Sequence, residues 1–208
     1  MTSISLHYRL KMIFLLSACF AVGYGYTNHF PVSTPRILPW TKVDDFFGFH
    51  PWTIWIYLSD YILIFLPAIL VTNSRVMKRL LKGYLVNFVI NFPIFFFFPT
   101  TLVRPPLVED SFLTQVFHLL WSIDAAVNCF PSQHVSLCFV VAMGFWNYRR
   151  RWAWGMIVWS LLISLSTLTT KQHYVWDVLG GLLVACVVYW MVYRKKEDPK
   201  IQLVSPEK

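Results

Sequence analysis

The sequence predicts an all-α, polytopic membrane protein with six transmembrane helices and an interfacial helix between the third and the fourth. Composition carries the first part of this prediction, because 57% of the 208 residues are apolar and only 13% are charged. Soluble globular domains contain about 25% charged residues. An aromatic content of 18% also excludes a disordered chain. The spacing of the apolar runs supplies the number of helices.

Six apolar runs are candidates for crossing a bilayer core, which takes roughly 20 helical residues and about 17 at the minimum. In chain order they are residues 12–26, 52–71, 80–98, 131–148, 152–168 and 174–193. The first run is the weakest. Because Arg9 and Lys11 precede it, it also fits a signal peptide. We expect it to be a retained anchor.

Residues 110–124 have an apolar side and a polar side at helical spacing. The apolar positions are Phe112, Val116, Leu119, Leu120 and Ile123, and the polar ones are Ser111, Gln115, His118 and Ser122. This pattern predicts a helix that lies in the membrane interface. We expect residues 1–208 to form a single membrane domain, with its catalytic core at about 80–193 and a flexible cytoplasmic tail at 194–208.

Lysine and arginine residues gather on one side of this six-helix topology. Fourteen of the 18 lie before the first run, after the last run or in the connections on that same side. The other four are Arg36, Lys42, Arg104 and Lys171. The positive-inside rule therefore predicts cytoplasmic termini and an outer face, periplasmic, lumenal or extracellular, that carries these four cations. The net charge of +8 reflects this topology and does not indicate a nucleic-acid partner.

Three polar segments at the outer ends of the predicted helices contain residues suited to phosphoryl transfer. They are residues 99–105 with Arg104, residues 130–134 with Ser132, Gln133 and His134, and residues 170–177 with Lys171, His173 and Asp177. Because His173 and Asp177 are four residues apart, a helix would place them on one side. The carboxylate would then keep one ring nitrogen protonated and leave the other as a nucleophile or base.

The other polar residues of these segments are suited to binding an anion. A helix that begins after Pro131 presents free backbone N–H groups at its first residues, which favours phosphate. Arg104 and Lys171 add the positive charge that a phosphoryl transition state requires. Together with the two histidines and the aspartate, these features predict covalent phosphoryl transfer through a phosphohistidine.

The sequence Pro131-Ser132-Gln133-His134, followed by His173-x-x-x-Asp177, resembles the motifs of the type 2 phosphatidic acid phosphatase (PAP2) superfamily over roughly residues 80–193. Gln133 stands where that family usually has glycine, which is similar to the branch that contains inositol phosphorylceramide synthases. The resemblance implies that His173 attacks phosphorus, Asp177 orients it and His134 protonates the leaving oxygen. It also implies that the phosphate is bound by Arg104, Ser132, Gln133 and Lys171.

The chain departs from the family pattern at two positions. The first motif of the family has lysine seven residues before its Arg-Pro pair, where this chain has Phe97. The third motif begins with Ser-Arg, whereas here Ser166 is followed by Thr167. We expect Lys171 to supply the missing positive charge. These differences bear on phosphate affinity and substrate class more than on the type of reaction.

We therefore expect a membrane lipid phosphatase that hydrolyses a lipid phosphomonoester or pyrophosphate at the outer face, with no cofactor, no metal and no obligate protein partner. A metal site is disfavoured because clustered carboxylates or a thiolate are missing and the neighbouring cations would repel a divalent ion. One alternative is a lipid phosphotransferase that moves a phosphate-bearing headgroup to an alcohol. A second alternative is a non-catalytic carrier of lipid phosphates.

Three further features of the sequence have a structural interpretation, and the first of them also has a functional one. Asp60 lies inside the second apolar run, where a charge indicates either a paired network or a role in headgroup or proton handling. Asp124 is expected to pair with Arg104 or to cap a helix. The pair Gly180-Gly181 is expected to be a surface of close helix packing.

Overall fold

The computed structural model describes residues 4–107 and 111–194. Five helical segments in it are long and apolar enough to span a membrane, namely Leu6–His29, Pro51–Leu70, Ser74–Phe97, Arg150–Thr169 and Val175–Tyr193. They correspond to five of the six predicted runs. The remaining run, residues 131–148, is the fourth in chain order and contains a helix of 12 residues, Gln133–Gly144. That helix rises about 18 Å, which is short of a hydrocarbon core about 30 Å thick.

The described residues are mostly helical. In chain order the elements are α1 (Leu6–His29), β1 (Arg36–Ile37), α2 (Lys42–Phe46), η1 (Pro51–Thr53), α3 (Ile54–Leu58), α4 (Asp60–Leu70), α5 (Ser74–Phe97), β2 (Thr100–Thr101), α6 (Phe112–Ile123), α7 (Gln133–Gly144), α8 (Arg150–Thr169), α9 (Val175–Val188) and a π-helical turn, Tyr189–Tyr193. The strands β1 and β2 pair in parallel. These two short strands are a small exception to the all-α prediction. Their backbone hydrogen bonds join the connection after α1 to the connection after α5.

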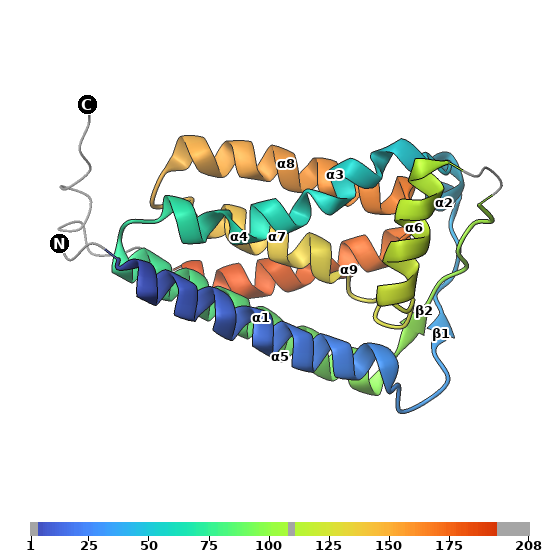
Figure 1. The fold of residues 1–208 in the computed structure, drawn as a ribbon, viewed down its shortest axis with the longest axis horizontal. Coiled ribbons are helices and arrows are strands. Elements are labelled where there is room, and N and C mark those ends of the chain that lie inside the picture. The colour runs from blue at the N-terminus through green and yellow to red at the C-terminus, as the bar shows by residue number, and fades with distance from the viewer. Residues whose placement is uncertain (1–3, 108–110, 195–208) are drawn as a thin grey trace.

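The short helix α7 is the centre of the bundle and packs against α4, α5, α8 and α9. Its residues from Val135 to Ala142 are all buried. A helix that is apolar on every side is typical of a fully enclosed position. The longer helices surround it, so lipid does not have to cover α7 along its length (Figure 1).

The outward faces of the surrounding helices are apolar. Phe14 on α1, Val89 on α5 and Leu183 on α9 are among the exposed large side chains. Water is a poor solvent for such a belt of side chains, whereas the bilayer core is a good one. The long apolar helices and this exposed apolar surface identify a membrane protein. Helices α1 and α5 run side by side along one edge of the bundle (Figure 1).

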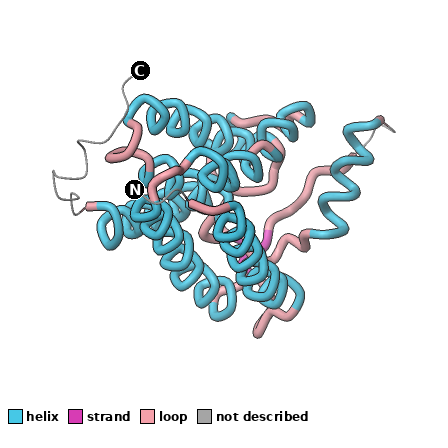
Figure 2. The backbone as a smooth tube through the Cα atoms, turned by 60° about the vertical axis from the view of Figure 1, so that its left-hand side comes forward, coloured by secondary structure: helices cyan, strands magenta, loops and turns pink. Residues whose placement is uncertain are grey.

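The predicted amphipathic helix is present as α6, at the end of the bundle where α2, β1 and β2 also lie (Figures 1 and 2). Phe117 of α6 is buried in a cluster with Ile54 and Tyr57. Phe112 and Ile123, by contrast, are exposed. The described helix is Phe112–Ile123, and residues 108–110 at the start of the predicted segment lie outside the described residues. The predicted tail also lies outside them from residue 195 onward.

Candidate active site

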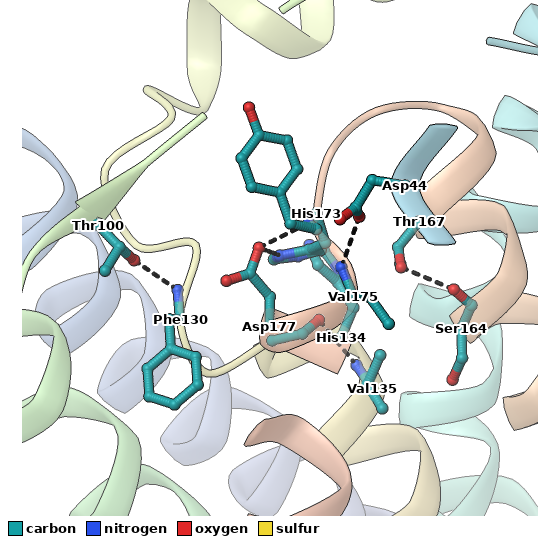
Figure 3. Close-up of polar contacts among 12 residues, drawn as sticks. Asp44, Thr100, Phe130, His134, Val135, Ser164, Thr167, His173, Val175 and Asp177 are labelled. Atoms are coloured by element: carbon teal, nitrogen blue, oxygen red, sulfur yellow. Dashed lines mark hydrogen bonds and ion pairs between the residues drawn. The ribbon is translucent and has the colours of Figure 1, made fainter. Parts of the chain in front are cut away.

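The three polar segments singled out in the sequence meet at one end of the bundle. They follow the end of α5, precede the start of α7 and connect α8 with α9. The connection after α1 covers the same end, because Asp44 of α2 accepts a hydrogen bond from the backbone N–H of Val175 (Figure 3). All the predicted site residues are therefore in one region, as the alternation of helix directions requires.

His173 and Asp177 form the centre of this region (Figure 3). The Nδ1 atom of His173 lies 3.5 Å from Oδ2 of Asp177, and both side chains are buried. The prediction that one helix face carries both residues is wrong, because His173 precedes α9 and Tyr174 is the N-cap. Asp177 instead occupies the first turn, where Oδ2 accepts the Tyr174 backbone N–H at 2.7 Å. The Asp177 carboxylate thus both fixes the start of α9 and faces the His173 imidazole.

The start of α7 is joined to this pair through Ser132. Its backbone N–H donates to the Asp177 carbonyl at 2.9 Å, and its hydroxyl oxygen accepts the Val135 N–H. The Ser132 N–H is therefore occupied, whereas the sequence predicted it to be free for an anion. The first-turn N–H groups of Gln133 and His134 have no acceptor within their own helix. These two groups are the ones available to an anion.

The Gln133 side chain points into the bundle interior. Its amide nitrogen donates to Oδ1 of Asn87 at 2.9 Å, and Asn91 donates to the same oxygen. Buried polar side chains are usually hydrogen-bonded, and these three amides pair with one another across the two helices. The Gln133 side chain therefore links α7 to α5, and it is not among the residues that line the pocket beside His173.

A small pocket lies beside His173. It is lined by Tyr24, Tyr57, Arg104, Asp124, Ala125, Ala126, Asn128, Cys129, Gln172 and His173. Among these described residues, Arg104 has the one cationic side chain. Its guanidinium donates to the carbonyls of Asp124 and Trp121 and lies over the Trp121 ring. Burial lowers the Arg104 pKa and Asp124 opposes that shift.

Lys171 is directed away from this pocket. Its ammonium donates to the backbone carbonyls of Asp44 and Phe47 and lies 5.0 Å from the centre of the Trp40 ring. Burial lowers the Lys171 pKa, with Asp44 opposing. In this arrangement Lys171 fixes the connection that contains α2. The expectation that it supplies the missing positive charge to phosphate is not supported by its position.

Thr167 stands where the PAP2 motif pattern that the sequence resembles has arginine, and its polar atoms bond to the backbone of its own segment. Its hydroxyl donates to the Ser164 carbonyl (Figure 3). Its own carbonyl accepts the backbone N–H groups of Gln172 and His173. Thr167 therefore holds the turn that presents His173, and positive charge at the pocket depends on Arg104.

His134 is held by two residues that the sequence analysis did not assign to the site. Its Nδ1 lies 2.5 Å from Oδ2 of Asp60, and its Nε2 lies 2.7 Å from the Tyr57 hydroxyl. This contact identifies the paired network as the structural role of Asp60. The three-residue spacing of Tyr57 and Asp60 was a usable signal that they share a helix face. The sequence contained no signal that this face meets α7.

The first helix contributes one wall of the pocket. Tyr24 donates its hydroxyl to the Asp124 carboxylate at 2.9 Å, and Asn28 donates to the same oxygen. Asp124 also caps α6 through its backbone N–H, which donates to the Leu120 carbonyl. Both expectations for Asp124 therefore hold in part, although Arg104 meets its carbonyl and not its carboxylate.

The segment that contains most of the site is similar to known proteins. Residues 98–200 match the PAP2 superfamily. The chain is in addition 26% identical over 141 residues to a protein of Bacillus subtilis (strain 168) named undecaprenyl-diphosphatase BcrC. This alignment covers 64% of the chain and 66% of the relative's length. No solved structure gives a significant match.

The segment that matches the PAP2 superfamily contains every site residue predicted from the sequence. These residues are Arg104, Ser132, Gln133, His134, Lys171, His173 and Asp177. Tyr24, Asp44, Tyr57 and Asp60 lie outside it. The PAP2 match and the similarity to a protein named as a diphosphatase are the findings from which a function can be proposed.

Proposed function

We propose that this protein hydrolyses a lipid phosphomonoester or pyrophosphate by way of a phosphohistidine, with His173 as nucleophile. The observation that carries the proposal is the position of His173, which lines a pocket with Arg104 while Asp177 lies 3.5 Å from its Nδ1. The name of the Bacillus relative, a diphosphatase of a lipid-like polyprenyl chain, supports the substrate class.

In the proposed reaction Nε2 of His173 attacks phosphorus, because Nδ1 faces Asp177. The bond from phosphorus to the leaving oxygen breaks as the bond to nitrogen forms. The negative charge of Asp177 stabilises the cationic ring of the phosphohistidine. Arg104 and the N–H groups at the start of α7 stabilise the phosphoryl oxygens. Water then attacks phosphorus, which releases inorganic phosphate and restores His173.

We also propose that the site faces the outer side of the membrane, with cytoplasmic termini. The distribution of 14 cations on one side and four on the other supports this orientation. We take α7 and the turn that follows it as the fourth of six crossings, enclosed by the other helices. Helix α6 would lie in the interface through its exposed Phe112 and Ile123. A lipid could then keep its chain in the bilayer while its phosphate reaches His173.

Two other functions fit the same residues and are distinguished by experiment. A lipid phosphotransferase, as in the inositol phosphorylceramide synthase branch, would pass the phosphate-bearing group to an alcohol where the hydrolase uses water. A non-catalytic carrier would bind lipid phosphates without turnover. Because water and alcohol acceptors would use the same histidines, residue geometry does not separate the first two functions.

The test is product analysis with the purified protein in lipid vesicles. A polyprenyl diphosphate, a phosphatidate and a phosphatidylglycerol phosphate are supplied with and without diacylglycerol, ceramide or a sugar lipid. We expect inorganic phosphate without any acceptor. Headgroup or phosphate found only on an added acceptor would instead establish a transferase. Binding without any product, unchanged in His173→Ala, would establish a carrier.

Chelator and vanadate tests address the chemistry of the site. Within the described residues, no three His, Cys, Asp or Glu side chains are grouped so that they could hold a metal ion. We therefore expect full activity in EDTA and inhibition by vanadate, which mimics five-coordinate phosphorus. Loss of activity in EDTA that zinc or magnesium restores would contradict the metal-independent mechanism.

A further inference from the structure

We propose that the Tyr57 hydroxyl carries the proton between His134 and the leaving oxygen of the substrate, and that Asp60 positions His134 for this transfer. The inference rests on the proposed hydrolase function and adds two residues to it. Both residues lie outside the segment that matches the PAP2 superfamily.

The pocket beside the predicted nucleophile is lined by Tyr57, which also contacts His134. Tyr57, Arg104 and His173 line it together, whereas His134 is not among its lining residues in the described part of the chain. The His134 and His173 rings are 5.8 Å apart between centroids. The Tyr57 hydroxyl lies 2.7 Å from Nε2 of His134. Tyr57 therefore combines a hydroxyl bonded to His134 with a place in the wall of the pocket beside His173.

The Asp60 carboxylate fixes the orientation of the His134 ring. Asp60 is fully buried, and its Oδ2 lies at hydrogen-bond distance from Nδ1. This contact holds a proton on Nδ1 and directs Nε2 toward Tyr57. The ring of Tyr57 is in turn fixed by packing against Ile54 and by Phe117 of α6. Such a chain of fixed groups is what efficient proton transfer requires, because each donor must already lie near its acceptor.

The proposed transfer balances in both halves of the reaction. When His173 attacks, the Tyr57 hydroxyl gives its proton to the leaving oxygen and takes the Nε2 proton of the His134 imidazolium. His134 is then neutral. When water attacks the phosphohistidine, a proton of the water passes to the Tyr57 oxygen while the hydroxyl proton returns to His134. The enzyme is restored with one substrate and one water consumed.

A proton relay matters only when the leaving group needs a proton. An aliphatic lipid alcohol leaves poorly as an alkoxide, so loss of the acid should slow its release by about 100-fold or more. A nitrophenolate leaves readily without protonation. Comparing a lipid alkyl monophosphate with 4-nitrophenyl phosphate therefore separates the relay from every other function of the site.

The experiment measures kcat for both substrates in Tyr57→Phe, Asp60→Asn, Tyr61→Phe and His173→Ala. Tyr61 is the matched control. It is a tyrosine one turn further along the chain, and its ring meets the His134 ring edge-on with 6.4 Å between centroids. We expect Tyr57→Phe to lose about 100-fold on the lipid monophosphate and less than about threefold on 4-nitrophenyl phosphate. Asp60→Asn should show the same split with a smaller loss, and Tyr61→Phe should show none.

The outcomes distinguish this inference from the proposed function. Equal losses on both substrates in Tyr57→Phe, or no loss on either, would overturn the relay while hydrolysis by His173 stands. Wild-type protein that turns over neither substrate, or His173→Ala that retains turnover, would overturn the proposed function. Retained turnover of 4-nitrophenyl phosphate also demonstrates that a variant is folded, so a misfolded variant is not mistaken for a missing proton donor.

Discussion

The Asp44 carboxylate accepts a hydrogen bond from the backbone N–H of Val175, so the connection after the first helix holds the start of the helix next to the predicted nucleophile. The same carboxylate accepts the backbone N–H and the hydroxyl of Thr41. Asp44 is buried, and its carbonyl receives the Lys171 ammonium. Loss of this one side chain would leave three partly buried donors, the Val175 N–H and the N–H and hydroxyl of Thr41, without this acceptor.

Replacing Asp44 by Ala should therefore destabilise the protein by about 2–3 kcal/mol. We expect a decrease in melting temperature on the order of 5 °C in detergent, together with reduced kcat because the His173 turn loosens. The matched control is Asp45→Ala, since Asp45 is exposed and its carboxylate is bonded to Trp40 at the surface. Equal melting temperatures for the two variants would contradict this function of Asp44.

The close approach of α9 to the start of α7 depends on glycine. A Cβ atom at Gly181 would lie 2.6 Å from the carbonyl oxygen of Ser132, a backbone atom that has little freedom to move. Gly181→Ala should displace the Ser132 segment from Asp177, with a cost of about 1–3 kcal/mol and a loss of activity. Thermal unfolding and kcat measured together test this expectation.

Gly155 on α8 provides the control for the glycine substitution. A Cβ at this position meets nothing within 4 Å, so Gly155→Ala should be neutral or stabilising by up to about 1 kcal/mol through helix propensity. If both alanine variants behave alike, the expected clash at Gly181 does not limit stability. Close packing at Gly180-Gly181 was predictable from the sequence. The atom that Gly181 packs against, the carbonyl oxygen of Ser132, was not.

The phosphate affinity of the site should depend on Arg104. Arg104→Lys keeps the charge but loses the planar guanidinium that bonds two carbonyls and stacks on Trp121. We expect kcat/KM to fall by about 100-fold and vanadate inhibition to weaken in parallel. Arg36→Lys is the control, because Arg36 is exposed at the same end of the bundle. A vanadate affinity unchanged in Arg104→Lys would argue against phosphate contact by Arg104.

Most of the secondary structure was predictable because long apolar runs leave few alternatives in a membrane, where every backbone polar group must be paired internally. The exception, α7, ends at Gly144, well before the apolar run does. Its burial comes from the neighbouring helices α4, α5, α8 and α9, which a local pattern does not reveal. The site residues in the three polar segments, 99–105, 130–134 and 170–177, were predictable from motifs. Tyr57 and Asp60 were not, because their partner His134 lies more than 70 residues away in the sequence.

Lys171 illustrates the limit of assigning a side chain from its position beside a motif. Its backbone φ of 53° lies in the left-handed region, and this turn directs the ammonium toward the α2 carbonyls. Lys171→Met should therefore lower thermal stability while leaving vanadate affinity within about twofold, because Arg104 supplies the pocket charge. Comparing vanadate inhibition of Lys171→Met and Arg104→Lys tests this division of function. Equal weakening in both variants would return Lys171 to the phosphate site.

The orientation proposed for the membrane is testable with single cysteines. Lys42 is exposed at the end of the bundle that carries the site, and Lys78 is exposed near the start of α5 at the opposite end. In intact cells, Lys42→Cys should react with a membrane-impermeant maleimide, whereas Lys78→Cys should react only after permeabilisation. The wild-type chain, with its four free cysteines, gives the background labelling. Protection of Lys42→Cys together with free labelling of Lys78→Cys would reverse the topology and place hydrolysis on the cytoplasmic face.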